Sequence, residues 1–240
     1  MKQRLVLASG NPHKVAELSA MFEVELPRLE VVGMKSLGAP PIIEETSNTF
    51  EGNALLKARG IAAWALSLGE DGGTLVLADD SGIVVDALDG APGVLSARFA
   101  GEQGDDGANN RKLVAELKAR GLEASPAHYA CVLALVRVDG ADLGPVDADS
   151  DAGCWADAGA WCLAGRCEGE VRTESRGEGG FGYDPHFWVD GRARTFAELS
   201  RSAKASRSHR GVALRLLATR LPALLASERP PSRGHEASGR

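Results

Sequence analysis

Apolar runs and amphipathic stretches alternate along the first third of the chain. Residues 5–8 form a short apolar run that stops at Ser9-Gly10-Asn11-Pro12, a sequence typical of a buried strand followed by a turn. Apolar residues then recur at helical spacing over 14–22, and a second apolar stretch covers 29–34. This opening pattern predicts a strand, a loop, a helix and a second strand.

A longer helix is predicted from Thr49 to Leu68. Its apolar stripe consists of Ala54, Leu55, Ala58, Ile61, Ala62 and Ala65. Asn53 and Lys57 are four residues apart and share a different face of this helix. Most lysines on helices are solvated, and this is the simplest interpretation of Lys57. The preceding segment, 38–45, contains adjacent prolines and is expected to be a loop or a sheet edge.

The middle of the chain is richer in strands. A third strand is expected over 74–78, ending in Asp79-Asp80-Ser81-Gly82, and the extended pattern resumes at 83–85. A helix is predicted over 109–120, and 128–138 is a long β-rich run.

Less regular segments follow. Residues 140–160 are rich in Gly, Ala and Asp, include an Asp-rich run at 147–151, and are expected to form an exposed excursion. A glycine-rich loop covers 177–183 and precedes an aromatic stretch at 187–189. Ser208 can cap a last helix. The apolar positions of that helix that are expected to pack inward are Val212, Leu216, Leu217, Leu221 and Leu224.

These elements indicate a mixed α/β fold with a central sheet flanked by helices. We interpret residues 1–226 as a single domain of two lobes with a cleft between them, carrying an extra loop at 140–160. The tail, 227–240, has too little apolar content to fold. The 240 residues are 44% hydrophobic, which is enough for a core without disulfides or a structural metal.

Charge and composition exclude several classes of function. The chain carries 27 Lys and Arg against 33 Asp and Glu, a net charge of -6, which argues against a broad nucleic-acid-binding surface. No apolar run approaches the roughly 18 residues of a membrane-spanning helix. The N-terminus lacks a signal peptide and the four cysteines form no Cys-x-x-Cys pair. We therefore expect a cytoplasmic protein with reduced thiols and no nucleic-acid or membrane partner.

The loop from Ser9 to Lys14 joins a predicted strand to a predicted helix. Its backbone N–H groups meet at a helix N-terminus, which favours phosphate, and Lys14 adds a positive charge. The alternative is a plain strand-to-helix turn with a solvated lysine, because the full spacing of a Walker motif is absent.

Two carboxylate pairs favour a divalent cation. Asp79 and Asp80 follow a buried strand, where α/β folds place ligands, although a simple Asp-rich turn has the same composition. Glu44 and Glu45 lie on a loop, where adjacent carboxylates are usually solvated. They indicate a functional site only together with a third carboxylate and a cation. Mg²⁺ takes a few carboxylates and completes its octahedron with waters and substrate phosphates. Arg98 is an additional candidate cation.

The C-terminal third adds aromatic side chains and a second set of cations. Phe181 and Tyr183 interrupt the glycine-rich loop, where an aromatic ring can stack on a purine base. Lys204, His209 and Arg210 are expected at the first turn of the last helix, a second anion-receptive helix end. Combined with the phosphate loop and the carboxylates, these residues describe a nucleoside-triphosphate site with Mg²⁺.

An ordered series of motifs resembles that of the inosine triphosphate pyrophosphatases (XTP/dITP diphosphohydrolases). The series spans about residues 4 to 225, and as an ordered set it is highly specific. Its members are Ser9-Gly10-Asn11-x-x-Lys14 with Glu17 following, Glu44-Glu45-Thr46, Thr49-Phe50-x-x-Asn53-Ala54-x-x-Lys57-Ala58, Ala78-Asp79-Asp80-Ser81-Gly82, Gly90-Ala91-Pro92-Gly93, Ser96-Ala97-Arg98, Gly179-Gly180-Phe181-Gly182-Tyr183-Asp184-Pro185 and Ser208-His209-Arg210-Gly211.

The resemblance implies an elongated α/β structure with a mixed sheet, two lobes and a central substrate cleft. Such enzymes hydrolyse the triphosphates of inosine, deoxyinosine and xanthosine (ITP, dITP and XTP) to the monophosphate and pyrophosphate. They thereby keep deaminated purines out of DNA and RNA. They are typically homodimers that need Mg²⁺, so we expect both properties here.

The resemblance also implies roles for residues at matching positions. Asp80 would be the general base that activates water, and Glu44 and Asp80 would hold the metal, with Glu45 and Asp79 in support. Donors from His209, Arg210 or the loop backbone would read the 6-oxo group of the purine. The residues expected to hold the nucleotide are Ser9, Gly10, Asn11, Pro12, His13, Lys14, Ser81, Phe181, Gly182, Tyr183, Asp184, Lys204, His209 and Arg210.

Three other interpretations remain open. A Maf-type nucleotide pyrophosphatase shares the reaction, but the Ser-His-Arg turn and the glycine loop argue against it. A catalytically silent nucleotide sensor would need no positioned base, so Glu44 and Asp80 argue against that class. An RNA-binding module is disfavoured by the negative net charge. The segment 140–160 is longer than the family pattern needs, and the tail is additional to that pattern.

Overall fold

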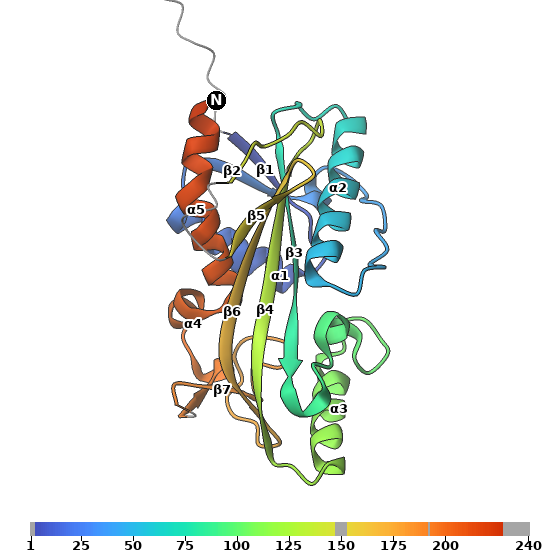
Figure 1. The fold of residues 1–240 in the computed structure, drawn as a ribbon, viewed down its shortest axis with the longest axis vertical. Coiled ribbons are helices and arrows are strands. Elements are labelled where there is room, and N and C mark those ends of the chain that lie inside the picture. Colours follow the sequence, from blue (N-terminus) through green and yellow to red (C-terminus); the bar gives the residue numbers. More distant parts are fainter. Residues whose placement is uncertain (1–2, 147–152, 192, 228–240) are drawn as a thin grey trace, which may run out of the picture.

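A mixed sheet of eight strands forms the backbone of the molecule (Figure 1). The structure, a computed structural model, describes residues 3–146, 153–191 and 193–227. Strand order is β2-β1-β3-β4-β6-β7-β8, and β5 pairs with β6. β1 is parallel to β2 and β3, and the later pairs are antiparallel. The strands are β1 (Gln3–Leu7), β2 (Leu29–Gly33), β3 (Leu75–Val85), β4 (Ala124–Arg137), β5 (Cys154–Asp157), β6 (Ala160–Arg172), β7 (Phe187–Val189) and β8 (Arg194–Thr195).

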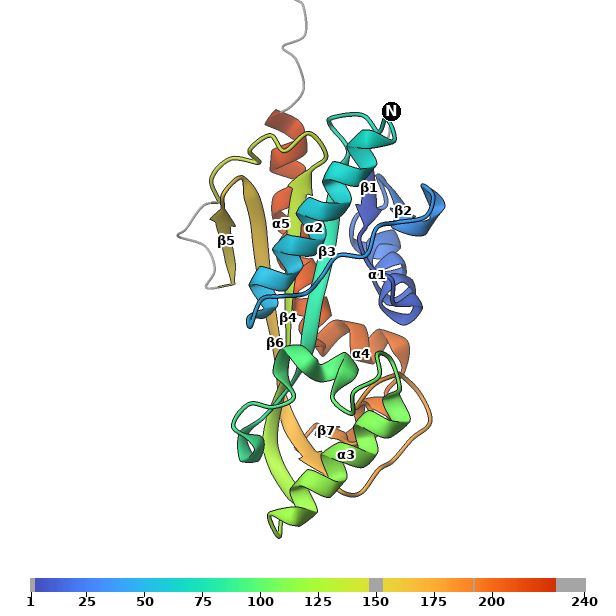
Figure 2. The same ribbon diagram turned by 90° about the vertical axis from the view of Figure 1, so that its right-hand side faces the viewer.

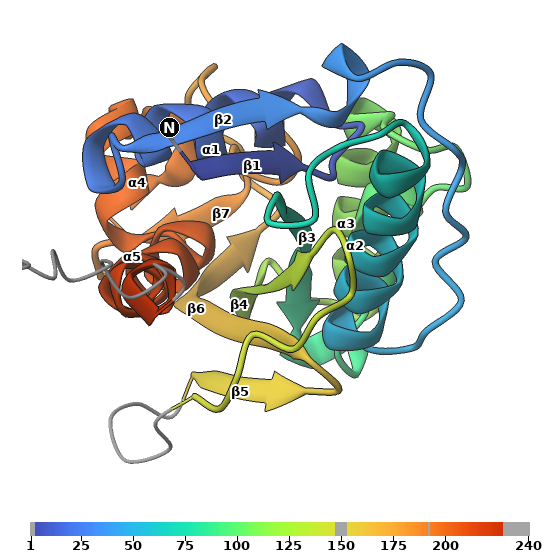
Figure 3. The ribbon, with the colours of Figure 1, turned by 90° about the horizontal axis from the view of Figure 1, so that it is seen from above.

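Helices cover both faces of the sheet, as the view from above shows (Figure 3). They are α1 (Pro12–Glu25), α2 (Phe50–Ser67), α3 (Asp106–Ala119), α4 (Arg201–Arg207) and α5 (His209–Ser227). Alternate strand residues point to opposite faces. Leu5, Leu7 and Leu77 therefore pack under α1 and α5, whereas Val6 and Val76 pack under the alanine-rich stripe of α2. No helix within the described ranges is long and apolar enough to cross a membrane.

A second lobe is built on the long strands where they extend past the end of β1. There α3 and β7 flank β4 and β6 (Figure 2), and a separate core gathers around Tyr129, Phe187 and Phe196. The expected elongated mixed sheet, flanked by helices and divided into two lobes, is confirmed.

The third strand does not end where the sequence indicated. β3 continues through Asp79 and Asp80 to Val85, because β4 pairs with it along its whole length, with Leu133 opposite Asp79 and Val132 opposite Asp80. The interpretation of these carboxylates as a strand end or an Asp-rich turn is therefore wrong. They lie in the middle of a paired strand.

The description of 140–160 as an exposed excursion is only partly right. Residues Cys154–Asp157 form β5, and the Trp155 indole donates to the Glu51 carboxylate of α2 at 2.6 Å. Leu143 is buried. The Asp-rich run at 147–151 lies outside the described residues, as does the tail beyond Ser227.

Helix α5 lies directly against β6 at Gly165. A Cβ there would lie 1.9 Å from the His209 carbonyl oxygen and 2.7 Å from the Ala213 nitrogen. Because both neighbours are backbone atoms, Gly165→Ala is expected to lower the free energy of unfolding by roughly 1–3 kcal/mol, measured by chemical denaturation. Gly33→Ala is the matched control, since its Cβ would meet nothing nearer than 3.9 Å. Equal effects of the two substitutions would contradict this close approach.

Candidate active site

Strand β3 carries the candidate site at the point where its neighbour β1 ends. On β3, the residues that pair with β1 are Leu75, Val76 and Leu77, and after β1 the chain turns through the Ser9 to Lys14 loop into α1. Asp79 and Asp80 follow on β3, and their side chains point to opposite faces of the sheet. The two adjacent carboxylates therefore belong to two different clusters of side chains.

Asp79 is the centre of a buried cluster on the α1 and α5 side, which we call the Asp79 cluster. Its Oδ2 accepts a hydrogen bond from Arg210 Nε at 2.8 Å and one from the Cys131 thiol at 3.2 Å. Its Oδ1 accepts from Ser81 Oγ at 2.9 Å and contacts the Lys14 ammonium. Burial alone would raise the pKa of Asp79, but the adjacent Arg210 and Lys14 hold it well below its usual value.

Arg210 ties three elements together from a side chain that is almost fully buried. Besides Asp79, its guanidinium donates to Ser81 Oγ at 2.9 Å and to the Glu17 carboxylate on α1. Glu17 also lies 3.6 Å from the Lys204 ammonium on α4. The planar fork of donors thus links α1, β3 and α5 through charge-assisted hydrogen bonds.

Asp80 faces α2 and forms a second cluster, the Asp80 cluster. The Lys57 ammonium lies 2.6 Å from Asp80 Oδ1 and 3.0 Å from Glu45 Oε1, and Arg98 donates to Glu45 Oε2 at 2.9 Å. Lys57 is therefore not solvated, and that interpretation is wrong. Burial raises the pKa of Asp80 despite the neighbouring Lys57. Burial would also raise the pKa of Glu45, yet Lys57 and Arg98 bring it below its ordinary value.

The Asp80 cluster fits a divalent cation. Asp80 Oδ2 is buried and has no hydrogen-bond partner among the described residues, and Glu45 lies on the other side of Lys57. Glu44, in contrast, is exposed and makes no ion pair within the described part of the chain. The described residues include no group of three or more His, Cys, Asp or Glu suited to a metal. Two carboxylates with substrate oxygens and water match how Mg²⁺ is usually held.

The expected phosphate loop is pinned at the start of α1. Asn11 caps the helix, its Oδ1 accepting from the His13 nitrogen at 2.9 Å and the Lys14 nitrogen at 3.3 Å. The Asn11 nitrogen donates to Ser9 Oγ at 3.3 Å, and Pro12 takes the first helical position. The Gly10 carbonyl lies 3.5 Å from the Lys35 ammonium. Asn11 thus already satisfies two N–H groups at the start of α1, and the Lys14 ammonium is paired with Asp79.

The glycine-rich loop folds around Asp184. Asp184 Oδ2 accepts from the Phe181 nitrogen at 2.9 Å and from the Lys204 ammonium at 2.5 Å. The Lys204 ammonium also lies 4.7 Å from the centroid of the Phe181 ring. Gly182 is held by its nitrogen, which donates to Asp106 Oδ2 at 2.6 Å. Lys204 lies on the separate short helix α4, so its expected place at the first turn of the last helix is wrong.

Two side chains that we expect at the nucleotide, Tyr183 and His209, are buried. Tyr183 is buried and its hydroxyl donates to the Ser96 carbonyl at 2.8 Å. The His209 ring stacks on Tyr129 with centroids 4.7 Å apart, and burial keeps its pKa well below the usual value. His209 Nδ1 is buried without a hydrogen-bond partner among the described residues. The expected cap of α5 is confirmed, since Ser208 Oγ accepts from the Gly211 nitrogen at 3.1 Å.

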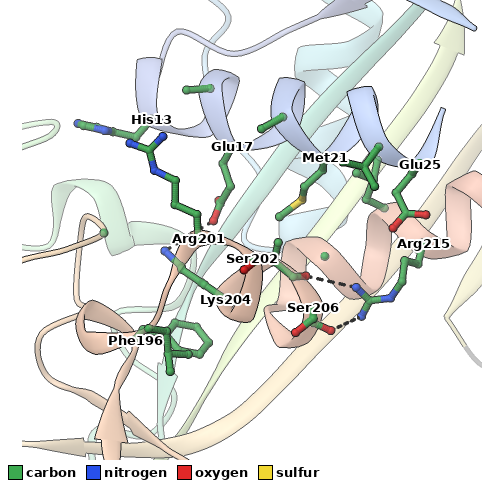
Figure 4. A pocket seen from close by; sticks show the side chains of 18 of the residues that line it. His13, Glu17, Met21, Glu25, Phe196, Arg201, Ser202, Lys204, Ser206 and Arg215 are labelled. Atoms are coloured by element: carbon green, nitrogen blue, oxygen red, sulfur yellow. Dashed lines mark hydrogen bonds and ion pairs between the residues drawn. The ribbon is translucent and has the colours of Figure 1, made fainter. Parts of the chain in front are cut away.

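A cavity of about 690 Å³ opens beside Glu17 and Lys204 (Figure 4). One wall is α1, with His13, Glu17 and Met21, and the facing wall comes from α4 and α5, with Lys204 on α4. Phe181 of the glycine-rich loop lines the same cavity. Expected nucleotide-binding residues therefore line the cavity from both walls, with His13 on α1 and Phe181 and Lys204 opposite.

Comparisons with known proteins agree on one family. Residues 5–220 match the sequence profile of the Ham1 family. A protein of Bacillus anthracis named dITP/XTP pyrophosphatase is 42% identical over 222 residues, which cover 92% of this chain and 97% of that protein. A protein of the same name from Streptomyces coelicolor is 40% identical over 215 residues, covering 89% and 94% of the two chains.

Solved structures give the same result for the fold. A HAM1 protein from Coxiella burnetii is similar with a TM-score of 0.73 and 35% identity, covering 92% of this chain and 99% of that chain. The Staphylococcus aureus Ham1 protein is similar with a TM-score of 0.70 and 36% identity, with the same coverage.

Proposed function

Because the chain belongs to the Ham1 family, we propose that it hydrolyses ITP, dITP and XTP to the nucleoside monophosphate and pyrophosphate. Relatives named dITP/XTP pyrophosphatase, which match most of this chain, support the substrate class. The single observation that carries the proposal is Asp80, a buried carboxylate with one oxygen that has no partner among the described residues, placed beside Lys57. Removing deaminated purines in this way would cleanse the nucleotide pool.

Asp80 is the general base of the proposed reaction. Its free Oδ2 would accept a proton from the attacking water, and its raised pKa makes the carboxylate a better proton acceptor than an exposed aspartate. Lys57 holds Oδ1 and so fixes the direction in which Oδ2 points. Lys14, at the start of α1, would hold the triphosphate and neutralise part of its charge.

Glu45 and Asp80 would hold Mg²⁺ in this scheme, with Glu45 in place of the expected Glu44. The ion, when bound, supplies positive charge against the charge that develops on the leaving pyrophosphate. Arg98 keeps Glu45 turned toward Lys57 and Asp80. As further parts of the proposal, the enzyme is cytoplasmic and forms a homodimer. The molecule that it binds is the nucleoside triphosphate substrate.

Glu45→Gln is expected to raise the Mg²⁺ concentration needed for half-maximal activity by roughly 10–100-fold, the usual cost of disturbing a metal site. The matched control is Glu44→Gln, one residue away and exposed, for which the Mg²⁺ dependence should stay at the wild-type value. Titration of activity with Mg²⁺ measures both variants. A larger shift in Mg²⁺ dependence for Glu44→Gln than for Glu45→Gln would assign Glu44 to the metal site and exclude Glu45.

The base would stack on Phe181, between the cations of α4 and α5. The Lys204 ammonium lies 4.7 Å and the Arg210 guanidinium carbon 5.9 Å from the Phe181 centroid. A 6-oxo purine presents an acceptor where adenine presents an amino donor. Lys204 and Arg210 are hydrogen-bond donors and would therefore favour the deaminated base. Against adenine, a buried donor would be left without an acceptor.

Pyrophosphate release with Mg²⁺ tests the proposed function directly. We expect fast release from ITP, dITP and XTP and slow release from ATP and GTP. Addition of EDTA should stop the reaction. Absence of release from all five nucleotides, with nucleotide binding intact, would overturn the proposal in favour of a silent nucleotide sensor.

A further inference from the structure

The imidazole of His13 lies against the Phe181 ring in the lining of the cavity. The two ring centroids are 5.4 Å apart and the planes are inclined by only 13°, which is the geometry of an offset stack. His13 comes from the first turn of α1 and Phe181 from the glycine-rich loop, 168 positions later in the numbering, and both line the same cavity. Within the described residues, Phe181 has no other aromatic ring partner.

Phe181 is held in place, whereas His13 is free to move aside. The Phe181 nitrogen is bonded to Asp184, and the Lys204 ammonium lies over the ring. The His13 side chain is exposed. In the described part of the chain, the hydrogen bond of His13 is made by its backbone nitrogen, which donates to the Asn11 cap. The imidazole can therefore leave the stack by rotation about its side-chain bonds, while Phe181 remains where it is.

We propose that His13 competes with the purine base for the face of Phe181 and so weakens the apparent affinity for nucleotide. A base that stacks on the covered face has to displace the imidazole, since rings with centroids 5.4 Å apart leave no room for a third ring between them. The inference rests on the proposed function, because it takes Phe181 as the surface on which the base stacks. His13 would then act through Phe181 rather than on the reacting atoms.

The size of the effect follows from the strength of such a stack. Aromatic pairs of this kind contribute enough to lower an apparent affinity by roughly 2–10-fold when one ring must first be displaced. The displacement is the same for every base. Removing His13 is therefore expected to strengthen binding of all base-containing ligands by a similar factor, and to leave the preference for deaminated purines unchanged.

Two substitutions at this position should shift KM in opposite directions. His13→Ala removes the competing ring and is expected to lower KM for ITP by roughly 2–10-fold. His13→Phe provides a more apolar competitor and is expected to raise it. The matched control is Glu23→Ala, at an exposed residue of α1 outside the cavity lining, for which KM should stay at the wild-type value.

A ligand without a base separates competition from phosphate binding. Inhibition by inorganic tripolyphosphate should be the same for wild type and His13→Ala, because this probe does not need the Phe181 face. A higher KM together with weaker tripolyphosphate inhibition in His13→Ala would overturn the proposal and make His13 a phosphate contact. Unchanged KM in both His13 variants would also overturn it.

Binding of inosine monophosphate, measured by calorimetry, keeps this test apart from the test of the proposed function. We expect affinity to fall in the order His13→Ala, wild type, His13→Phe. If no triphosphate releases pyrophosphate, the proposed function fails, while this order still decides the role of His13. Any other order of the three affinities would contradict the competition.

Discussion

Asp80→Asn is expected to lower kcat for pyrophosphate release from ITP by roughly 10²–10⁴-fold, the usual loss when a general base is removed. The substitution keeps the shape of the side chain and leaves an oxygen for Lys57, which lies 2.6 Å from Asp80 Oδ1. It removes the carboxylate that accepts the proton from water. Steady-state kinetics at saturating Mg²⁺ would measure the loss, and calorimetry should show that the variant still binds nucleotide.

Asp157→Asn is the matched control for this substitution. Asp157 on β5 forms a half-exposed ion pair with Arg59 of α2. Its kcat should equal that of the wild-type enzyme. Unchanged kcat in Asp80→Asn as well would remove Asp80 from the mechanism.

Arg210→Met is expected to give the largest loss of stability. Asp79 is fully buried and Arg210 is its close partner at 2.8 Å, so the substitution leaves a buried carboxylate paired mainly with Lys14. Breaking a buried ion pair in this way costs about 3–5 kcal/mol. For a protein of this size the melting temperature should fall by roughly 6–20 °C, which calorimetry can measure.

Two further variants test the cause of that loss. Arg59→Met breaks a half-exposed ion pair and is expected to cost less than about 1 kcal/mol. Adding Asp79→Asn to Arg210→Met should restore part of the stability, because the unpaired buried charge disappears. A double variant that is less stable than the single one would show that the carboxylate is not the source of the cost.

Local patterns in the sequence were sufficient to predict most helices. The stripe from Ala54 to Ala65 is buried on α2 as expected, and Thr49 caps that helix. The motifs at Ser9 to Lys14 and at Ser208 also lie at the starts of helices. These features depend on neighbours within about four residues, so the spacing of residue types carries the information.

Features that depend on distant partners could not be predicted in this way. β3 continues past Asp79 because β4 supplies its hydrogen bonds, and β4 begins some forty positions later. Arg210 meets Glu17 across a separation of 193 residues. Our proposal of Glu45 in place of Glu44 rests on Arg98, which reaches Glu45 from a separate 3-10 helical segment, Gly93–Arg98. Adjacent glutamates with the same chemistry cannot be told apart until such partners are known.

Because Asp79 and Asp80 lie within one paired strand, β3 should tolerate few insertions or deletions before these residues. A strand side chain changes face with every residue, so loss or gain of one residue between Leu75 and Ala78 would exchange the surroundings of Asp79 and Asp80 unless a bulge absorbed it. Asp79, the partner of Arg210, would then face α2, and Asp80, the partner of Lys57, would face α1 and α5. Substitutions can accumulate in this stretch, whereas single-codon insertions and deletions should be eliminated by selection.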